Sequence, residues 1–147
     1  MPLPTLCNEE RQRKRLAQRN ERNLYKRNCD LCKKVIIAVY PKNTDFPVYC
    51  SDCWWSDNWD PKIYERDFDF NRPFFDQFKE LQSKVPRVGV LTRNSENSEY
   101  TNCEAYQKNC YLTFAGGYSE DCMYCYFEIY CKDCLDCSFV EKCELCF

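Results

Sequence analysis

The residues of this sequence best suited to chemistry are its cysteines: the 147-residue chain has 14 of them and no histidine. Cys29, Cys32, Cys50 and Cys53 form the pattern C-x2-C-x17-C-x2-C. Two residues between paired cysteines let both sulfurs face one ion, and the longer separation suits a hairpin that brings the second pair opposite the first. We therefore predict one Zn²⁺ site with four thiolate ligands, which is closed and structural rather than catalytic.

A second group of cysteines lies in a twelve-residue repeat that begins at Ser95. Asn or Asp, Ser or Cys, Thr or Cys, and Tyr recur at fixed positions of the repeat. Such a period suits a β-solenoid, in which equivalent residues of successive coils stack about 4.8 Å apart. The pattern leaves open whether one coil takes one repeat or two.

The repeat cysteines have three possible states: buried free thiols, disulfides between coils, or metal ligands. A second metal site would use Cys122, Cys125, Cys134 and Cys137. An alternative set is Cys131, Cys134, Cys143 and Cys146. Both sets need Cys134, so they cannot both be complete, and this conflict favours a ladder of free thiols.

The elements that would position these cysteines are mostly short. Residues 8–27 have the composition of a basic helix with a narrow apolar stripe, which is either solvated or ordered by a partner. Lys34–Tyr40 predicts a strand between the two cysteine pairs, and Arg87–Arg93 predicts another. Pro73 begins a predicted helix that ends before Pro86, with an apolar stripe expected to face the core. Its members are Phe74, Phe78, Leu81 and Val85.

We predict a small, mainly-β fold: a zinc ribbon plus one or two helices, followed by a Cys-rich β-solenoid with a twelve-residue repeat. The predicted domains are a basic helical segment (1–28), the ribbon (29–55), an aromatic linker with a helix near 73–85 (56–94), and the solenoid (95–147). The solenoid is expected to be incomplete at Phe147, because a last coil without a cap exposes a strand edge.

The composition disfavours an enzyme. The absence of histidine excludes general acid–base chemistry by histidine and all Cys–His and Ser–His nucleophile pairs. A redox role for the repeat cysteines is disfavoured because acidic neighbours such as Asp121 and Asp133 raise the pKa of a thiol. We predict a non-catalytic protein.

No export signal or membrane span is recognisable. Met1–Leu6 is short and is followed by charged residues from Glu9, and no run approaches the roughly 20 apolar residues of a transmembrane helix. We therefore predict a cytoplasmic protein without membrane contact. In that reducing compartment thiolate–metal bonding is favoured, whereas export by another route would favour disulfides.

Charge suggests a partner for the first third of the chain. Residues 1–55 carry 11 Lys and Arg against 6 Asp and Glu, a net of +5, while the remainder carries a net of −7. A basic surface favours nucleic acid or another polyanion. Trp54, Trp55 and Trp59 would stack on unpaired bases if exposed, although they are expected to complete the core of the ribbon. The candidate nucleic-acid contacts are Arg11, Arg13, Lys14, Arg15, Arg19, Arg22, Lys26, Arg27, Lys33 and Lys34.

Four stretches carry a resemblance to a known family: RLAQRNERNLYKRNCDLCKK, VYCSDCWWSDNWDP, RDFDFNRPFFDQF and NSENSEYTN. The sequence resembles a family of uncharacterised proteins predicted in metagenome-derived bacteria. That family looks like an N-terminal zinc ribbon, an aromatic linker and a long Cys-rich repeat region. The resemblance implies that the repeats of relatives continue past the position of Phe147, and it implies no activity.

Two functions follow from these patterns. The first is a zinc-binding, non-catalytic module whose basic N-terminal part contacts nucleic acid. The alternative is a structural or scaffold protein that binds protein partners, or associates with itself, through the Cys-rich solenoid.

Overall fold

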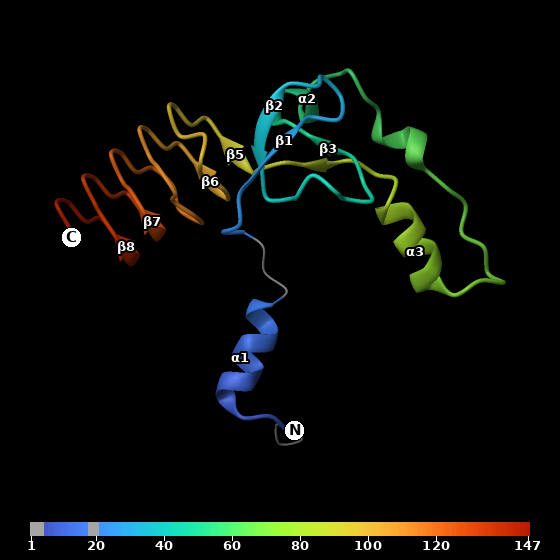
Figure 1. Cartoon of the computed structure of the whole chain (residues 1–147), viewed down its shortest axis with the longest axis horizontal. Helices are drawn as coiled ribbons and strands as arrows, with labels where there is room; N and C mark the ends of the chain where they lie inside the picture. The colour runs from blue at the N-terminus through green and yellow to red at the C-terminus, as the bar shows by residue number, and fades with distance from the viewer. Residues whose placement is uncertain (1–4, 18–20) are drawn as a thin grey trace.

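The computed structural model describes residues 5–17 and 21–147, without the side chains of Gln12, Arg15 and Leu16. The described part is small and mainly non-helical, with several short strands and the α-helices α1, α2 and α3 rather than the one or two predicted. A ribbon at the centre connects a stack of bends on one side to α3 on the other, and α1 extends away from both (Figure 1). None of the helices in these residues has the length and apolarity needed to cross a membrane.

The first helix is shorter than predicted. α1 covers Asn8–Leu16, whereas Tyr25–Asn28, predicted to be helical, forms the strand β1. β1 pairs antiparallel with β2 (Val35–Ala38), so this hairpin holds the first cysteine pair in its turn. The correction follows from tertiary pairing, which overrides the weak helix propensity of a segment with so few apolar residues.

A second pair of strands brings a distant segment to the ribbon. β3 (Val48–Tyr49) pairs in parallel with β4 (Arg87–Val88), and α2 (Ser51–Trp54) follows β3 directly. Gly89 joins this pair to the hairpin, because its amide donates to the Tyr49 carbonyl at 2.8 Å and its carbonyl accepts the Val39 amide at 2.9 Å. The sequence predicted one strand over Arg87–Arg93. The structure divides it into β4 and β5 (Thr92–Arg93).

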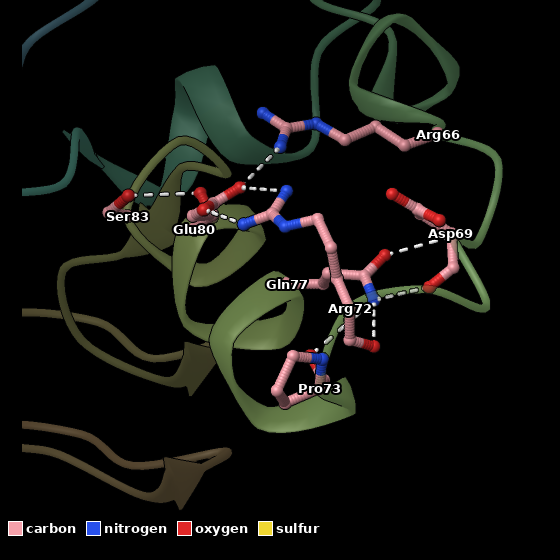
Figure 2. A network of polar contacts seen from close by, with 7 residues as sticks. All are labelled: Arg66, Asp69, Arg72, Pro73, Gln77, Glu80 and Ser83. Carbon is pink, nitrogen blue, oxygen red and sulfur yellow. Dashed lines mark hydrogen bonds and ion pairs between the residues drawn. The ribbon is translucent and has the colours of Figure 1, made fainter.

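The linker contains a 3-10 helix at Pro61–Tyr64 (η1) and the predicted helix α3 at Phe74–Gln82. Polar side chains fold the chain before α3 back onto it (Figure 2). Gln77 donates to the carbonyls of Asp69 and Arg72 at 2.9 Å each and accepts the Asp69 amide, while Glu80 pairs with Arg72. This polar network holds the linker in place where little apolar surface is buried.

The apolar stripe of α3 does not face a core, contrary to the prediction. Phe74 is 54% exposed and Phe78 is 44% exposed, and the two rings stack on each other with centroids 5.6 Å apart. Phe70 and Phe75 are still more exposed. The helical period was correct, but the linker residue that packs on this face, Phe68, is itself 45% exposed, with its ring centroid 6.3 Å from that of Phe74.

From β5 to Phe147 the chain forms a parallel ladder with a register of twelve residues, which we term the Cys-rich ladder (residues 92–147). β5 pairs with β6 (Glu104–Ala105), and β7 (Tyr126–Ile129) pairs with β8 (Ser138–Glu141). Isolated bridges continue the same register, as between Glu120 and Lys132. One twelve-residue repeat therefore corresponds to one step of the ladder.

Each repeat has an inner period of three residues. Asp121, Tyr124, Phe127 and Tyr130 have φ between 55° and 57°, and the residue after each of them is buried. Asn and Asp tolerate this left-handed conformation better than bulky residues, so the Tyr and Phe positions store backbone strain. Every third residue consequently faces inward, which gives four inward positions per repeat. They are Ser98, Thr101, Glu104 and Gln107, then Cys110, Thr113, Gly116 and Ser119, then Cys122, Cys125, Glu128 and Cys131, and then Cys134, Cys137, Val140 and Cys143.

Candidate metal centre

The four cysteines of the ribbon meet at one point. Their Sγ atoms all lie within 4.8 Å of one another, and Cys32 Sγ is 3.8 Å from Cys50 Sγ. A tetrahedral zinc ion with Zn–S bonds of about 2.3 Å requires sulfur–sulfur edges of about 3.8 Å. The donor set therefore fits a closed four-thiolate site for a soft or borderline divalent metal such as Zn²⁺.

Two structural elements present the pairs. Cys29 and Cys32 lie in the turn of the β1–β2 hairpin, and this turn closes because the Lys33 amide donates to the Cys29 carbonyl at 3.0 Å. Lys33 has φ of 62°, a conformation that glycine would adopt with less strain. Cys50 caps α2, since its sulfur accepts the Cys53 amide at 3.4 Å.

Backbone amides stabilise negative charge on the sulfurs. The Cys50 amide donates to Cys29 Sγ at 3.3 Å. Burial raises the pKa of the Cys29 thiol, but backbone hydrogen bonds from Cys50, Cys32 and Leu31 outweigh it and lower that pKa to about 7. The pKa of Cys53 is raised to about 12, mainly by burial, and burial also raises the pKa of Cys50. One thiol ionises readily, while deprotonation of its neighbours needs a cation.

An apolar wall protects the cluster. Cys29, Cys53 and Tyr49 are buried, and Trp54 and Trp59 pack against them. The Trp54 and Trp59 rings lie 4.8 Å apart, and the Trp59 indole N–H donates to the Trp54 carbonyl at 3.0 Å. These two tryptophans complete the small core, as predicted, whereas Trp55 is 72% exposed.

The cysteines of the second predicted metal site do not converge on one point as those of the ribbon do. Among the described residues only Cys29, Cys32, Cys50 and Cys53 reach the spacing of a metal cluster, and Cys122, Cys125, Cys134 and Cys137 do not form one. Their thiols instead donate to carbonyls: Cys125 Sγ lies 3.2 Å from the Met123 oxygen and 3.6 Å from the Cys134 oxygen. The free-thiol alternative fits this arrangement, and burial raises the pKa of Cys125 to about 12.

The predicted nucleic-acid contacts are divided between surface and interior. Arg27 is a correction, because it is 4% exposed and donates to Asp30, Thr44 and the Pro41 carbonyl. Arg22 lies over the Tyr126 ring at 3.6 Å. Arg19 and the side chain of Arg15 lie outside the described residues. Arg11 is half-buried, and the described contacts left exposed are Arg13, Lys14, Arg22, Lys26, Lys33 and Lys34.

The sequence analysis did not predict a cluster of buried polar side chains inside the Cys-rich ladder. Glu104, Gln107 and Glu128 are all buried, and the Gln107 amide donates to both carboxylates. The three-residue period was the signal that could have identified them, because it places both glutamates at inward positions of the repeat.

No protein-family model, curated protein or solved structure matches this chain. The resemblance of four of its stretches to metagenome-derived proteins therefore stays a prediction. Fold and site define the chain as a cysteine-rich protein with a four-cysteine centre suited to a metal ion.

Proposed function

We propose that this chain is a zinc-dependent, non-catalytic binding protein, in which the ribbon is a structural unit. The convergence of four sulfurs within 4.8 Å, with Cys29 and Cys53 buried, is the observation that supports the proposal. Four protein ligands leave no open position for a substrate. The ion would supply folding energy by joining the hairpin turn to α2, because a unit with so few buried side chains depends on its metal.

Zinc analysis tests this proposal directly. Purified, reduced protein is expected to hold one zinc ion per chain, and Cys53→Ala is expected to hold none. Cys7→Ala is the matched control, because Cys7 is an exposed thiol outside the cluster. A chain that keeps its fold after complete removal of zinc would contradict the structural role.

We infer that the basic N-terminal part of the chain, residues 1–55, binds nucleic acid. Arg13, Lys14, Lys26 and Lys34 are exposed, and Trp55 offers an indole to stack on an unpaired base. Phosphate contacts of this kind supply affinity without sequence readout, and the affinity falls as salt rises.

The experiment is a gel-shift titration of the zinc-loaded chain with single-stranded DNA and RNA over a salt series. The triple variant Lys14→Ala, Lys26→Ala, Lys34→Ala is expected to lower the slope of log affinity against log salt by about two to three, at unchanged zinc content. The matched control is Lys79→Ala, Lys84→Ala and Lys142→Ala, which removes equal charge from exposed positions elsewhere. Affinity that does not change with salt excludes this partner.

A scaffold role is the second candidate, favoured by the exposed aromatic side chains. Phe70 and Phe75 are 91% and 79% exposed, and stacked Tyr106, Tyr118 and Tyr130 run along the Cys-rich ladder at 4.8 and 4.9 Å. We interpret the ladder as a β-solenoid with one repeat per coil, whose strand edge would pair with a second copy of the chain. Sedimentation that gives a monomer at all concentrations would remove self-association.

A further inference from the structure

Two buried carboxylates share one interior column of the Cys-rich ladder. Glu104, Gly116 and Glu128 hold the same position in three successive repeats, and Glu104 and Glu128 are 4% and 0% exposed. A Cβ atom on Gly116 would lie 2.7 Å from Glu128 Cδ and 2.8 Å from Glu128 Oε2. The Glu128 carboxylate therefore turns into the space that a side chain at position 116 would fill.

Gln107 joins the two carboxylates. Its Nε2 donates to Glu104 Oε2 at 2.5 Å and to Glu128 Oε1 at 3.1 Å, so one amide holds together residues 24 positions apart. Four buried oxygens of this group have no hydrogen-bond partner. They are Glu104 Oε1, Gln107 Oε1, Thr113 Oγ1 and Glu128 Oε2.

These free atoms are acceptors. Ionised carboxylates and the amide oxygen accept only, and the Thr113 hydroxyl can accept as well. Burial raises the pKa of Glu104 to about 8, and repulsion from Glu128 contributes to the rise. A single shared proton satisfies one acceptor and leaves one negative charge in the interior, whereas a divalent cation neutralises both carboxylates and takes several oxygens as ligands.

A cavity of 710 Å³ gives access to this group. Arg93, Cys103, Glu104 and Gly116 line it from the ladder, and Leu91 and Trp55 line it from the neighbouring segments. A hydrated ion can reach Glu104 through this space and keep some of its waters, which would complete a coordination shell that four protein oxygens leave open.

We propose that Glu104, Gln107, Thr113 and Glu128 form an interior site for a hard divalent cation of the Ca²⁺ or Mg²⁺ class. The donor set is all oxygen, so it selects against the ion preferred by the sulfurs of the ribbon. The site pins the third repeat of the ladder to the first across Gly116.

The test is a thermal melt of the zinc-loaded chain in metal-free buffer, with and without millimolar CaCl₂ or MgCl₂. Ca²⁺ or Mg²⁺ is expected to raise Tm by about 5–10 °C at a concentration one hundred times Kd. Glu128→Gln and Glu104→Gln keep the side-chain shape and are expected to lose most of this rise. Glu144→Gln, an exposed carboxylate of the same ladder, is the matched control and is expected to keep it.

Equilibrium dialysis of the wild-type chain keeps the proposal testable if a Gln variant does not fold. One bound Ca²⁺ or Mg²⁺ per chain is expected in addition to zinc. No bound ion and no rise in Tm, or a rise that both Gln variants retain, would overturn the proposal. A melt that responds only to pH would assign the pair to proton sharing instead. These results are independent of zinc content, so they do not decide the role of the ribbon.

Discussion

The guanidinium of Arg27 donates to the carboxylate of Asp30 at 2.9 Å, and this ion pair connects β1 to the turn that carries the first two cysteines. The same Asp30 oxygen accepts the backbone amide of Val48 at 2.7 Å. Because Val48 begins β3, the pair also fixes the segment that leads to Cys50. A predicted phosphate contact is thus a structural support of the four-cysteine centre.

Replacing Arg27 is expected to destabilise the ribbon. Arg27→Gln removes the ion pair and leaves the Pro41 carbonyl and Asp30 with fewer donors, at a cost of about 2–3 kcal/mol in the free energy of unfolding. Urea unfolding of zinc-loaded protein measures the loss. Lys26→Gln, an exposed neighbour on the same strand, should change stability by less than about 0.5 kcal/mol. Equal effects of the two changes would contradict the structural role of Arg27.

Loss of a ligand should be visible in tryptophan emission. Cys50→Ala removes a sulfur that caps α2 and should abolish stoichiometric zinc, which frees Trp54 and Trp59 from the core around the site. We expect a red-shifted emission maximum together with zinc content near zero. Cys103→Ala, an exposed thiol of the ladder, is the control and should leave both unchanged. An emission maximum of metal-free Cys50→Ala that stays at the wild-type wavelength would show that the core around Trp54 and Trp59 does not depend on zinc.

Two glycines should respond differently to an added methyl group. A Cβ at Gly116 would lie 2.3 Å from the Glu128 carbonyl oxygen, so Gly116→Ala is expected to cost about 2–3 kcal/mol. The nearest atom to a Cβ at Gly89 is Ala38 Cβ at 3.2 Å, so Gly89→Ala should cost no more than about 1 kcal/mol. Chemical unfolding of both variants checks the order, and the reverse order would refute this packing of the ladder.

Stability should depend on pH through Glu104. Burial raises its pKa in the folded chain from 4.5 to about 8, so between these values the folded state binds more protons than the unfolded state. The contribution of Glu104 to the stability of the folded chain is complete below its pKa in the unfolded chain and is lost as pH rises through about 8. In buffer without free metal ions, with zinc kept in the ribbon, we expect the free energy of unfolding of Glu104→Gln to rise relative to that of the wild type. The expected rise is about 1 kcal/mol per pH unit from about pH 6 to 8. A constant difference across that range would contradict the buried, protonated carboxyl.

The ladder cysteines should label slowly as free thiols. Burial raises the pKa of Cys125 to about 12, and the side chain is 1% exposed, whereas Cys7 is exposed. Iodoacetamide should therefore modify Cys7 at least on the order of 100-fold faster than Cys125 under native conditions. Peptide mass spectrometry after timed quenching measures both rates. Cys125 recovered in a disulfide from carefully reduced, anaerobic material would overturn the thiol state.

The sequence alone determined the four-cysteine centre and the twelve-residue register of the ladder. Both depend on short, fixed spacings: C-x2-C pairs in a turn converge because of local geometry, and equivalent repeat residues pair because the backbone advances by the same amount each time. The sequence also predicted α3, since its helical period is a local property.

Only the tertiary structure decided which faces are covered. Arg27 is buried because the loop at Thr44 and the hairpin turn at Asp30 both accept hydrogen bonds from it, whereas Phe74 stays 54% exposed because it packs against a linker residue, Phe68, rather than against a core. The burial of Glu104 beside Glu128 depends on the inward turn of every third residue, which the composition of the repeat conceals. Spacing along a chain fixes which residues are neighbours within an element, whereas burial depends on what the rest of the chain places against them.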